Sequence, residues 1–127
     1  METVRRGDIW TVALLAHPKP RPALVISIDP INDLCPDVLV IPLTSHAGPL
    51  RVSLPEQPET TGLRTASFAK CESLGPVHKS RLKRRVGSIP SAAWIAIEEG
   101  VKRVLGLTEG GAGATADLDA SPAPSSS

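Results

Sequence analysis

The sequence is poor in the residues on which several common protein classes depend. Among its 127 residues it has only two cysteines, Cys35 and Cys71, which are too few for a disulfide framework and are not spaced as zinc ligands. Three aromatic residues and no tyrosine argue against a module that binds nucleic acid mainly by stacking bases on exposed rings. We therefore expect no metal site and a reducing compartment.

Long hydrophobic runs are also absent. The strongly apolar stretches, such as residues 38–43, are far shorter than the ~20 residues that span a bilayer. The first eight residues, METVRRGD, lack the apolar run of a signal peptide. These absences predict a protein that works in the cytoplasm without contacting a membrane.

Charge and composition divide the chain into two parts. Residues 1–107 contain all 14 Lys and Arg against 10 Asp and Glu, a net charge of +4, which permits an anionic partner without requiring one. Residues 108–127 contain three acidic residues, no basic residue and one large apolar residue, Leu118. Such a segment cannot bury enough surface to offset its ordering entropy. We expect one domain over residues 1–107 and a disordered tail over residues 108–127.

Short apolar segments with proline and glycine between them predict a mainly β domain. The segments with strand patterns are residues 9–15, 23–28, 37–43, 50–54 and 66–71, with a further short strand opening at Val77. No helix is expected before the C-terminal end. The spacing favours a small antiparallel barrel or sandwich over a parallel sheet.

One helix is predicted to close the domain. Pro90 suits the first helical position, and an apolar stripe follows at helical spacing: Trp94, Ile97, Val101, Val104 and Leu105. This stripe should cover one face or mouth of the barrel. Gly100 costs about 1 kcal/mol relative to Ala inside a helix, so either a neighbour packs closely there or the apolar face supplies most of the helix's stability.

Two candidate sites lie at strand ends. Arg21 stands between Pro20 and Pro22, which restrict the backbone that aims its guanidinium. It either points at a ligand or forms an ordinary surface charge or salt bridge. Thr44, with Ser45 and His46, follows an apolar strand, where its hydroxyl could hold a phosphate oxygen or bond local backbone in a turn.

A third candidate is the basic run from Lys79 to Arg85, which has five cations in seven residues, Arg81 among them. Together with Arg64 and Lys70 it could form a track for a polyanion or an acidic peptide. The alternative is a solvated basic face.

Several segments in order resemble the MazF/PemK/Kid family of toxin endoribonucleases. They are RRGDIW, RPALVIS, VIPLTS, GLRTASFAKCESL, KSRL and VGSIP, followed by the closing helix, over roughly residues 4–107. The resemblance implies a small SH3-like antiparallel barrel of the CcdB/MazF type with a C-terminal helix, working as a homodimer. It also implies cleavage of single-stranded RNA without metal or cofactor, and neutralisation by an acidic antitoxin.

The resemblance also assigns roles to residues. The family's catalytic Arg and Thr fall on Arg21 and Thr44. The implied reaction is attack of a ribose 2′-hydroxyl on the adjacent phosphate, which leaves a cyclic phosphate and a 5′-hydroxyl. Arg21 would stabilise the charge on the phosphoryl oxygens and Thr44 would fix one of them. The residues expected to bind RNA are Ser45, His46, Arg64, Lys79 and Arg81.

The chain departs from many relatives after the segment CESL. Those relatives carry an Arg and an Asp there, and this chain has Gly75 and His78. His78 is therefore the predicted acid–base partner of Arg21, with His17 in the shortened preceding loop as a second candidate. Two other functions stay open: a non-catalytic toxin that inhibits a target such as DNA gyrase by binding, and a catalytically silent RNA-binding barrel.

Overall fold

A computed structural model describes residues 3–14 and 18–107 of the chain. His17 and the predicted tail of residues 108–127 lie outside the described residues. No helix among the described residues is long and apolar enough to cross a membrane.

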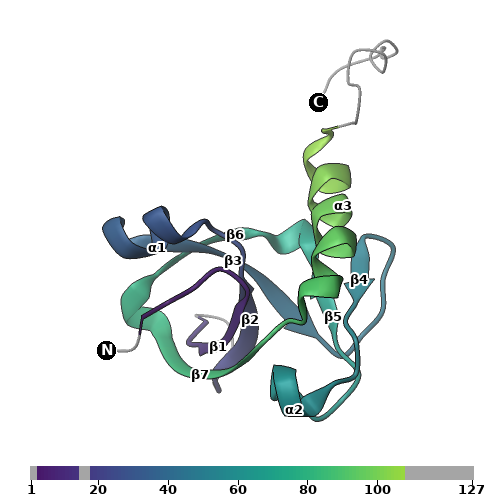
Figure 1. Ribbon diagram of the computed structural model, residues 1–127, viewed down its shortest axis with the longest axis horizontal. Helices are drawn as coiled ribbons and strands as arrows, with labels where there is room; N and C mark the ends of the chain where they lie inside the picture. The colour runs from purple at the N-terminus through teal and green to yellow at the C-terminus, as the bar shows by residue number, and fades with distance from the viewer. Residues whose placement is uncertain (1–2, 15–17, 108–127) are drawn as a thin grey trace.

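The strands and helices appear in the order shown in Figure 1. The strands are β1 (Asp8–Val12), β2 (Arg21–Val25), β3 (Asp37–Thr44), β4 (Arg51–Ser53), β5 (Phe68–Lys70), β6 (Gly75–His78) and β7 (Leu82–Ser88). The helices are α1 (Asp29–Leu34), α2 (Pro58–Thr61) and α3 (Trp94–Leu105), and three 3-10 turns are η1 (Cys71–Ser73), η2 (Lys79–Arg81) and η3 (Ser91–Ala93).

The strands form one antiparallel sheet in the order β4-β5-β3-β2-β1-β7. Strand β3 is long enough to take two further partners: its first half pairs with β6 and its last two residues pair with β5. The predicted mainly β fold with a C-terminal helix is confirmed.

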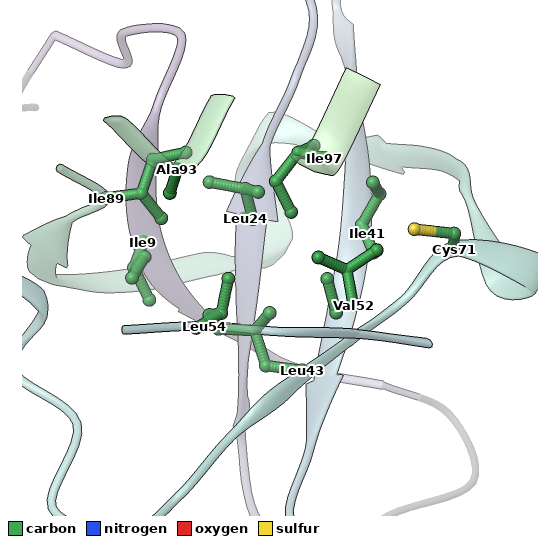
Figure 2. Packing of buried hydrophobic residues seen from close by; sticks show 11 residues of the cluster. Ile9, Leu24, Ile41, Leu43, Val52, Leu54, Cys71, Ile89, Ala93 and Ile97 are labelled. Atoms are coloured by element: carbon green, nitrogen blue, oxygen red, sulfur yellow. The ribbon is translucent and has the colours of Figure 1, made fainter. Parts of the chain in front are cut away.

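The three central strands, β1, β2 and β3, contribute side chains to two separate cores, because successive side chains in a strand point to opposite faces of the sheet. One face contributes to a helix-side core, whose members are Ile9, Leu24, Ile41, Leu43, Val52, Leu54, Ala69, Cys71, Ile89, Ala93 and Ile97. Figure 2 shows these side chains converging on one space beneath Ala93 and Ile97. The other face contributes to a barrel core, formed by Val4, Trp10, Val12, Ala23, Val25, Val38, Val40 and Leu82. An apolar core therefore lies on each face of these three strands.

Helix α3 lies close against the sheet at Gly100. A Cβ atom there would lie 2.7 Å from Val52 Cγ2 and 2.9 Å from Cys71 Sγ. Of the two explanations that the sequence left open for Gly100, close packing is therefore the one observed. The N-terminal turn of the helix is fixed by Arg6, whose guanidinium carbon lies 3.7 Å from the centroid of the Trp94 ring.

Helices α1 and α2 contradict the prediction that no helix precedes the C-terminal one. They have six and four residues, too short to display a 3.6-residue periodicity. Each carries proline in its first turn, Pro30 and Pro58, where proline suits a helix although it more often signals a loop. Helix α3 begins at Trp94 after η3 rather than at Pro90. Strand β7 was not predicted as a strand, and residues 82–85 of the basic run belong to it.

The contact between α2 and β7 provides a test of the fold. A Cβ atom on Gly87 would overlap the carbonyl oxygen of Thr61, which is backbone and cannot rotate away. We expect Gly87→Ala to lower the free energy of unfolding by about 1–3 kcal/mol, as overpacking typically does. Gly75→Ala is the matched control on another strand, because its new Cβ would meet only Ser73 O at 3.8 Å.

Urea unfolding followed by circular dichroism measures both variants. Gly75→Ala should stay within about 0.5 kcal/mol of the wild type. Equal stability of the two variants would contradict the packing described for α2 and β7.

Candidate active site

A cleft of about 580 Å³ opens where β2 begins and β3 ends. Both Arg21, the first residue of β2, and Thr44, the last residue of β3, line it. The last paired residues before the cleft are Ala23 and Pro42. Continuing this register by two residues along each strand places Arg21 opposite Thr44, so the two side chains lie on the same face of the sheet. The antiparallel pairing thus brings together residues 23 positions apart in the sequence.

The Arg21 guanidinium is free to meet a ligand. Arg21 is exposed, and among the described residues its side chain makes no hydrogen bond or ion pair. The backbone of Arg21 is held by pairing with Val12 in β1. The sequence alternative of a structural salt bridge is therefore not observed within the described part of the chain.

Thr44 takes part in a local turn. Its Oγ1 accepts a hydrogen bond of 3.2 Å from the backbone N–H of His46 and lies 3.5 Å from His46 Nδ1. The turn that the sequence left open as an alternative is therefore present. Oγ1 is the acceptor in the hydrogen bond from the backbone, so the hydroxyl hydrogen of Thr44 stays available for a second hydrogen bond. Thr44 can hold the turn and still donate to an oxygen in the cleft.

Arg51 holds the segment that follows Thr44. Its Nη1 donates to the carbonyl oxygen of His46 at 2.9 Å, and its Nε donates to Glu72 Oε2 at 3.1 Å. The pKa of the Glu72 carboxyl is lowered, first by a backbone hydrogen bond at Glu72 itself and then by the Arg51 guanidinium. The Glu72–Arg51 pair therefore fixes the position of His46 beside Thr44.

The cleft is cationic. Among the described residues, those that line it with a positive charge are Arg21, Arg64, Lys70 and Arg84, and none of the described lining residues is Asp or Glu. Arg64 reaches the cleft because α2 ends at Gly62, whose φ of 73° turns the chain back against β7. Arg84 lies in the cleft because of the register of β7, in which it pairs with Thr11 of β1, another lining residue. Such a lining attracts phosphate groups.

The predicted site residues do not all gather here. Ser45, His46 and Arg64 line the cleft with Arg21 and Thr44, whereas His78, Lys79 and Arg81 do not. The Arg81 guanidinium donates to the carbonyl oxygen of Ala13 at 2.8 Å, and the Lys79 backbone N–H donates to Pro36.

His78 is separated from the cleft by the length of β3. It pairs with Asp37 at the start of that strand, and Thr44 lies seven residues further on. At about 3.3 Å per residue this is roughly 23 Å. Within one chain, therefore, the structure does not bring His78 to Arg21 as the predicted acid–base partner.

Three polar residues of the cleft escaped the sequence reasoning: Thr11, Thr65 and Ser67. Thr65 follows Arg64 in the segment GLRT, so that segment contained the signal for it. Thr11 and Ser67 gave no local signal, because only the pairing of strands brings them to the cleft.

The described residues offer no cluster of three or more His, Cys, Asp or Glu that could hold a metal ion. Cys35 is exposed and Cys71 is buried, and burial raises the pKa of the Cys71 thiol. Cys71 is thus a packing residue of the helix-side core.

The fold and the cleft define a small antiparallel barrel protein with a phosphate-attracting cleft at one sheet end. Residues 5–105 match the model of the family described as PemK-like, MazF-like toxin of type II toxin-antitoxin system. The sequence is 31% identical over 117 residues to endoribonuclease MazF9 of Mycobacterium tuberculosis, which covers 82% of this chain and 98% of that protein. The chain belongs to this toxin family, and the predicted class, a MazF-like toxin endoribonuclease, is confirmed at the level of the family.

Solved structures share the fold. An endoribonuclease in complex with its cognate antitoxin from Mycobacterial species superposes with a TM-score of 0.70 at 23% identity, covering 86% of this chain and 99% of that one. A MazE–MazF structure from Deinococcus radiodurans gives a TM-score of 0.70 at 20% identity, covering 85% of this chain and 100% of that one. At these identities the likeness establishes the barrel fold.

The Glu72–Arg51 pair predicts a pH dependence. The pKa of Glu72 lies below its ordinary value of 4.5, so its stabilising charge is fully present at neutral pH and is lost as the pH falls from about 4.5 through the lowered value. Glu72→Gln removes this carboxylate. Its stability should therefore fall less steeply than that of the wild type below pH 4.5.

Thermal unfolding between pH 7 and pH 3 measures the difference. Glu56→Gln is the control, because the Glu56 carboxylate makes no hydrogen bond or ion pair among the described residues. The same pH slope in the wild type and in Glu72→Gln would show that the pair contributes nothing.

Proposed function

We propose that this toxin cleaves single-stranded RNA in the cleft between the start of β2 and the end of β3. The observation that supports this best is that Arg21, whose side chain has no partner among the described residues, lines the same cleft as the Thr44 hydroxyl at the adjoining ends of β2 and β3, where the described lining holds cations and no carboxylate. A phosphodiester is the anionic group that such a pair recognises.

The reaction is attack of a ribose 2′-hydroxyl on the adjacent phosphorus. A bond forms from O2′ to phosphorus, the bond from phosphorus to O5′ breaks, and the products carry a 2′,3′-cyclic phosphate and a 5′-hydroxyl. Arg21 donates to the phosphoryl oxygens, where negative charge accumulates in the transition state. The Thr44 hydroxyl donates a hydrogen bond to one of these oxygens and so fixes the position of that oxygen. No metal ion takes part in this sequence of steps.

The neighbouring nucleotides bind along the same cleft. Arg64, Lys70 and Arg84 supply phosphate contacts, and Ser45 and His46 supply polar contacts beside the reacting phosphate. Lys79 and Arg81 lie off the cleft, so we leave them out of this RNA path.

The charges that many relatives carry near residues 75–78 are not needed in this cleft. Gly75 and His78 belong to β6, which pairs with the first half of β3 and not with the end that meets the cleft. Their lack of charge therefore does not favour a non-catalytic toxin over a nuclease.

Partners follow from the charge of the cleft and from the family. A homodimer would align two such barrels and lengthen the cationic surface that receives RNA. An antitoxin rich in Asp and Glu would neutralise the toxin by occupying the same cations. Residues 1–107 form the working domain, residues 108–127 the tail, and the RNA substrate places the activity in the cytoplasm.

Arg21→Ala tests the assignment. Loss of the guanidinium should lower the cleavage rate about 100- to 1,000-fold, the usual effect of removing one donor to a developing oxyanion. The assay uses a long unstructured RNA with EDTA present, and circular dichroism verifies the fold.

Arg5→Ala is the control, because Arg5 pairs with Asp29 and Asp33 away from the cleft and should keep the wild-type rate. Undiminished cleavage by Arg21→Ala would overturn the assignment. Absence of RNA cleavage by the wild type, combined with growth inhibition on expression, would instead support a toxin that acts by binding.

The RNA path is tested on two adjacent residues of β7. Arg84 lines the cleft, whereas Lys83, next to it on the strand, does not. Arg84→Gln should weaken binding of a 2′-deoxy RNA analogue and reduce the slope of log K against log salt by about 1. Lys83→Gln should leave the slope unchanged. An equal loss of RNA affinity in both variants would contradict a path confined to the cleft, because the charge of the whole basic face would then determine binding.

A further inference from the structure

The cleft is rich in groups that donate protons and poor in groups that accept them. Its guanidinium, ammonium and hydroxyl groups can all donate hydrogen bonds to phosphate oxygens. The attacking 2′-hydroxyl, however, must lose a proton, and the described part of the cleft lining offers no carboxylate to take it. Among the described lining residues, His46 is the one whose side chain carries a basic ring nitrogen that can take a proton.

The surroundings of His46 hold it where a base is needed. Its backbone N–H donates to Thr44 Oγ1 at 3.2 Å, and its carbonyl oxygen accepts from Arg51 at 2.9 Å. Its Nδ1 lies 3.5 Å from Thr44 Oγ1, whereas Nε2 makes no hydrogen bond among the described residues. His46 is therefore held through both its backbone N–H and its carbonyl oxygen, beside the hydroxyl proposed to hold the phosphate.

From this arrangement we propose that His46 is the general base of the cleavage reaction, an inference that rests on the proposed nuclease function. His46 Nε2 takes the proton of the 2′-hydroxyl while O2′ bonds to phosphorus. The electron pair of the breaking bond from phosphorus goes to O5′, which takes a proton from water. The imidazolium then returns its proton to solvent, so the enzyme is regenerated without any further reactant.

Arg51 and Glu72 act as positioning residues for this base. The charged groups of the cleft and of the neighbouring Arg51–Glu72 pair come from six elements or loops: Arg21 (β2), Arg51 (β4), Arg64 (the loop after α2), Lys70 (β5), Glu72 (η1) and Arg84 (β7). Only Glu72 is negative, and its charge is engaged by Arg51 at 3.1 Å. Glu72 therefore orients the base through Arg51 and does not itself accept the proton.

The two described histidines permit a direct comparison. His46→Ala should lower kcat about 100- to 10,000-fold, the range that general acid–base catalysis supplies, and should weaken the Kd for a 2′-deoxy RNA analogue by a much smaller factor, because His46 makes only one of several contacts to the RNA. His78→Asn should keep most of the wild-type kcat, because His78 lies at the other end of β3. Loss of kcat in His78→Asn but not in His46→Ala would overturn the proposal.

Two further readouts separate a base from a residue that only packs or binds. The wild-type kcat should rise with pH, because a base must be unprotonated to accept a proton, and His46→Ala should lack this rise. Added imidazole should restore cleavage to His46→Ala but not to Arg21→Ala. A variant that binds RNA normally, keeps the pH rise and gains nothing from imidazole would refute His46 as the base.

Arg21→Ala distinguishes failure of this inference from failure of the proposed function. If Arg21→Ala is inactive and His46→Ala is fully active, the cleft is the nuclease site but its base is another group. If Arg21→Ala and His46→Ala both cleave at the wild-type rate, the cleft is not the nuclease site.

Discussion

The antiparallel register between β2 and β3 is the constraint on which the candidate site depends. With Ala23 opposite Pro42, the next outward position on the same face sets Arg21 opposite Thr44. A slip of one residue would turn one of these side chains to the other face and would separate guanidinium from hydroxyl. The remaining strands add Arg64, Lys70 and Arg84 around this pair, so the chemistry of the cleft follows from pairing at one sheet end.

Burial on both faces of the sheet explains why this register is fixed. Leu24 and Ile41 face the helix-side core, whereas Ala23 and Val25 face the barrel core, so a slipped β2 would exchange apolar partners on both sides at once. Helix α3 covers the helix-side core and packs closely against Val52 and Cys71 at Gly100. The apolar core thus reaches the cleft at Leu43, and the groups beyond it are held by polar contacts such as that of Arg51 with His46.

Strands β1 to β6 and the terminal helix could be predicted from the sequence, because alternation and helical spacing leave local patterns. Strand β7 was missed, because its first residues read as part of a basic run. Helices α1 and α2 could not, since each begins with proline and is shorter than the period that would reveal it. Arg21 and Thr44 were accessible through the flanking prolines and the family segments, but their juxtaposition is a property of pairing. The same limit explains His78: the family resemblance offered it as a partner for Arg21, whereas β3 holds the two apart. His46, predicted from the sequence as an RNA contact, is proposed as the base because of its place in the cleft.

The central claim is that Arg21 and Thr44 act together on one phosphate, and a double-mutant cycle of Arg21→Ala and Thr44→Val measures this most directly. Single-turnover cleavage of one RNA by the wild type, the two single variants and the double variant gives the coupling free energy. Residues that act as a unit are non-additive, so the double variant should lose much less than the sum of the two single losses. Strict additivity, or wild-type cleavage by the double variant, would contradict the account.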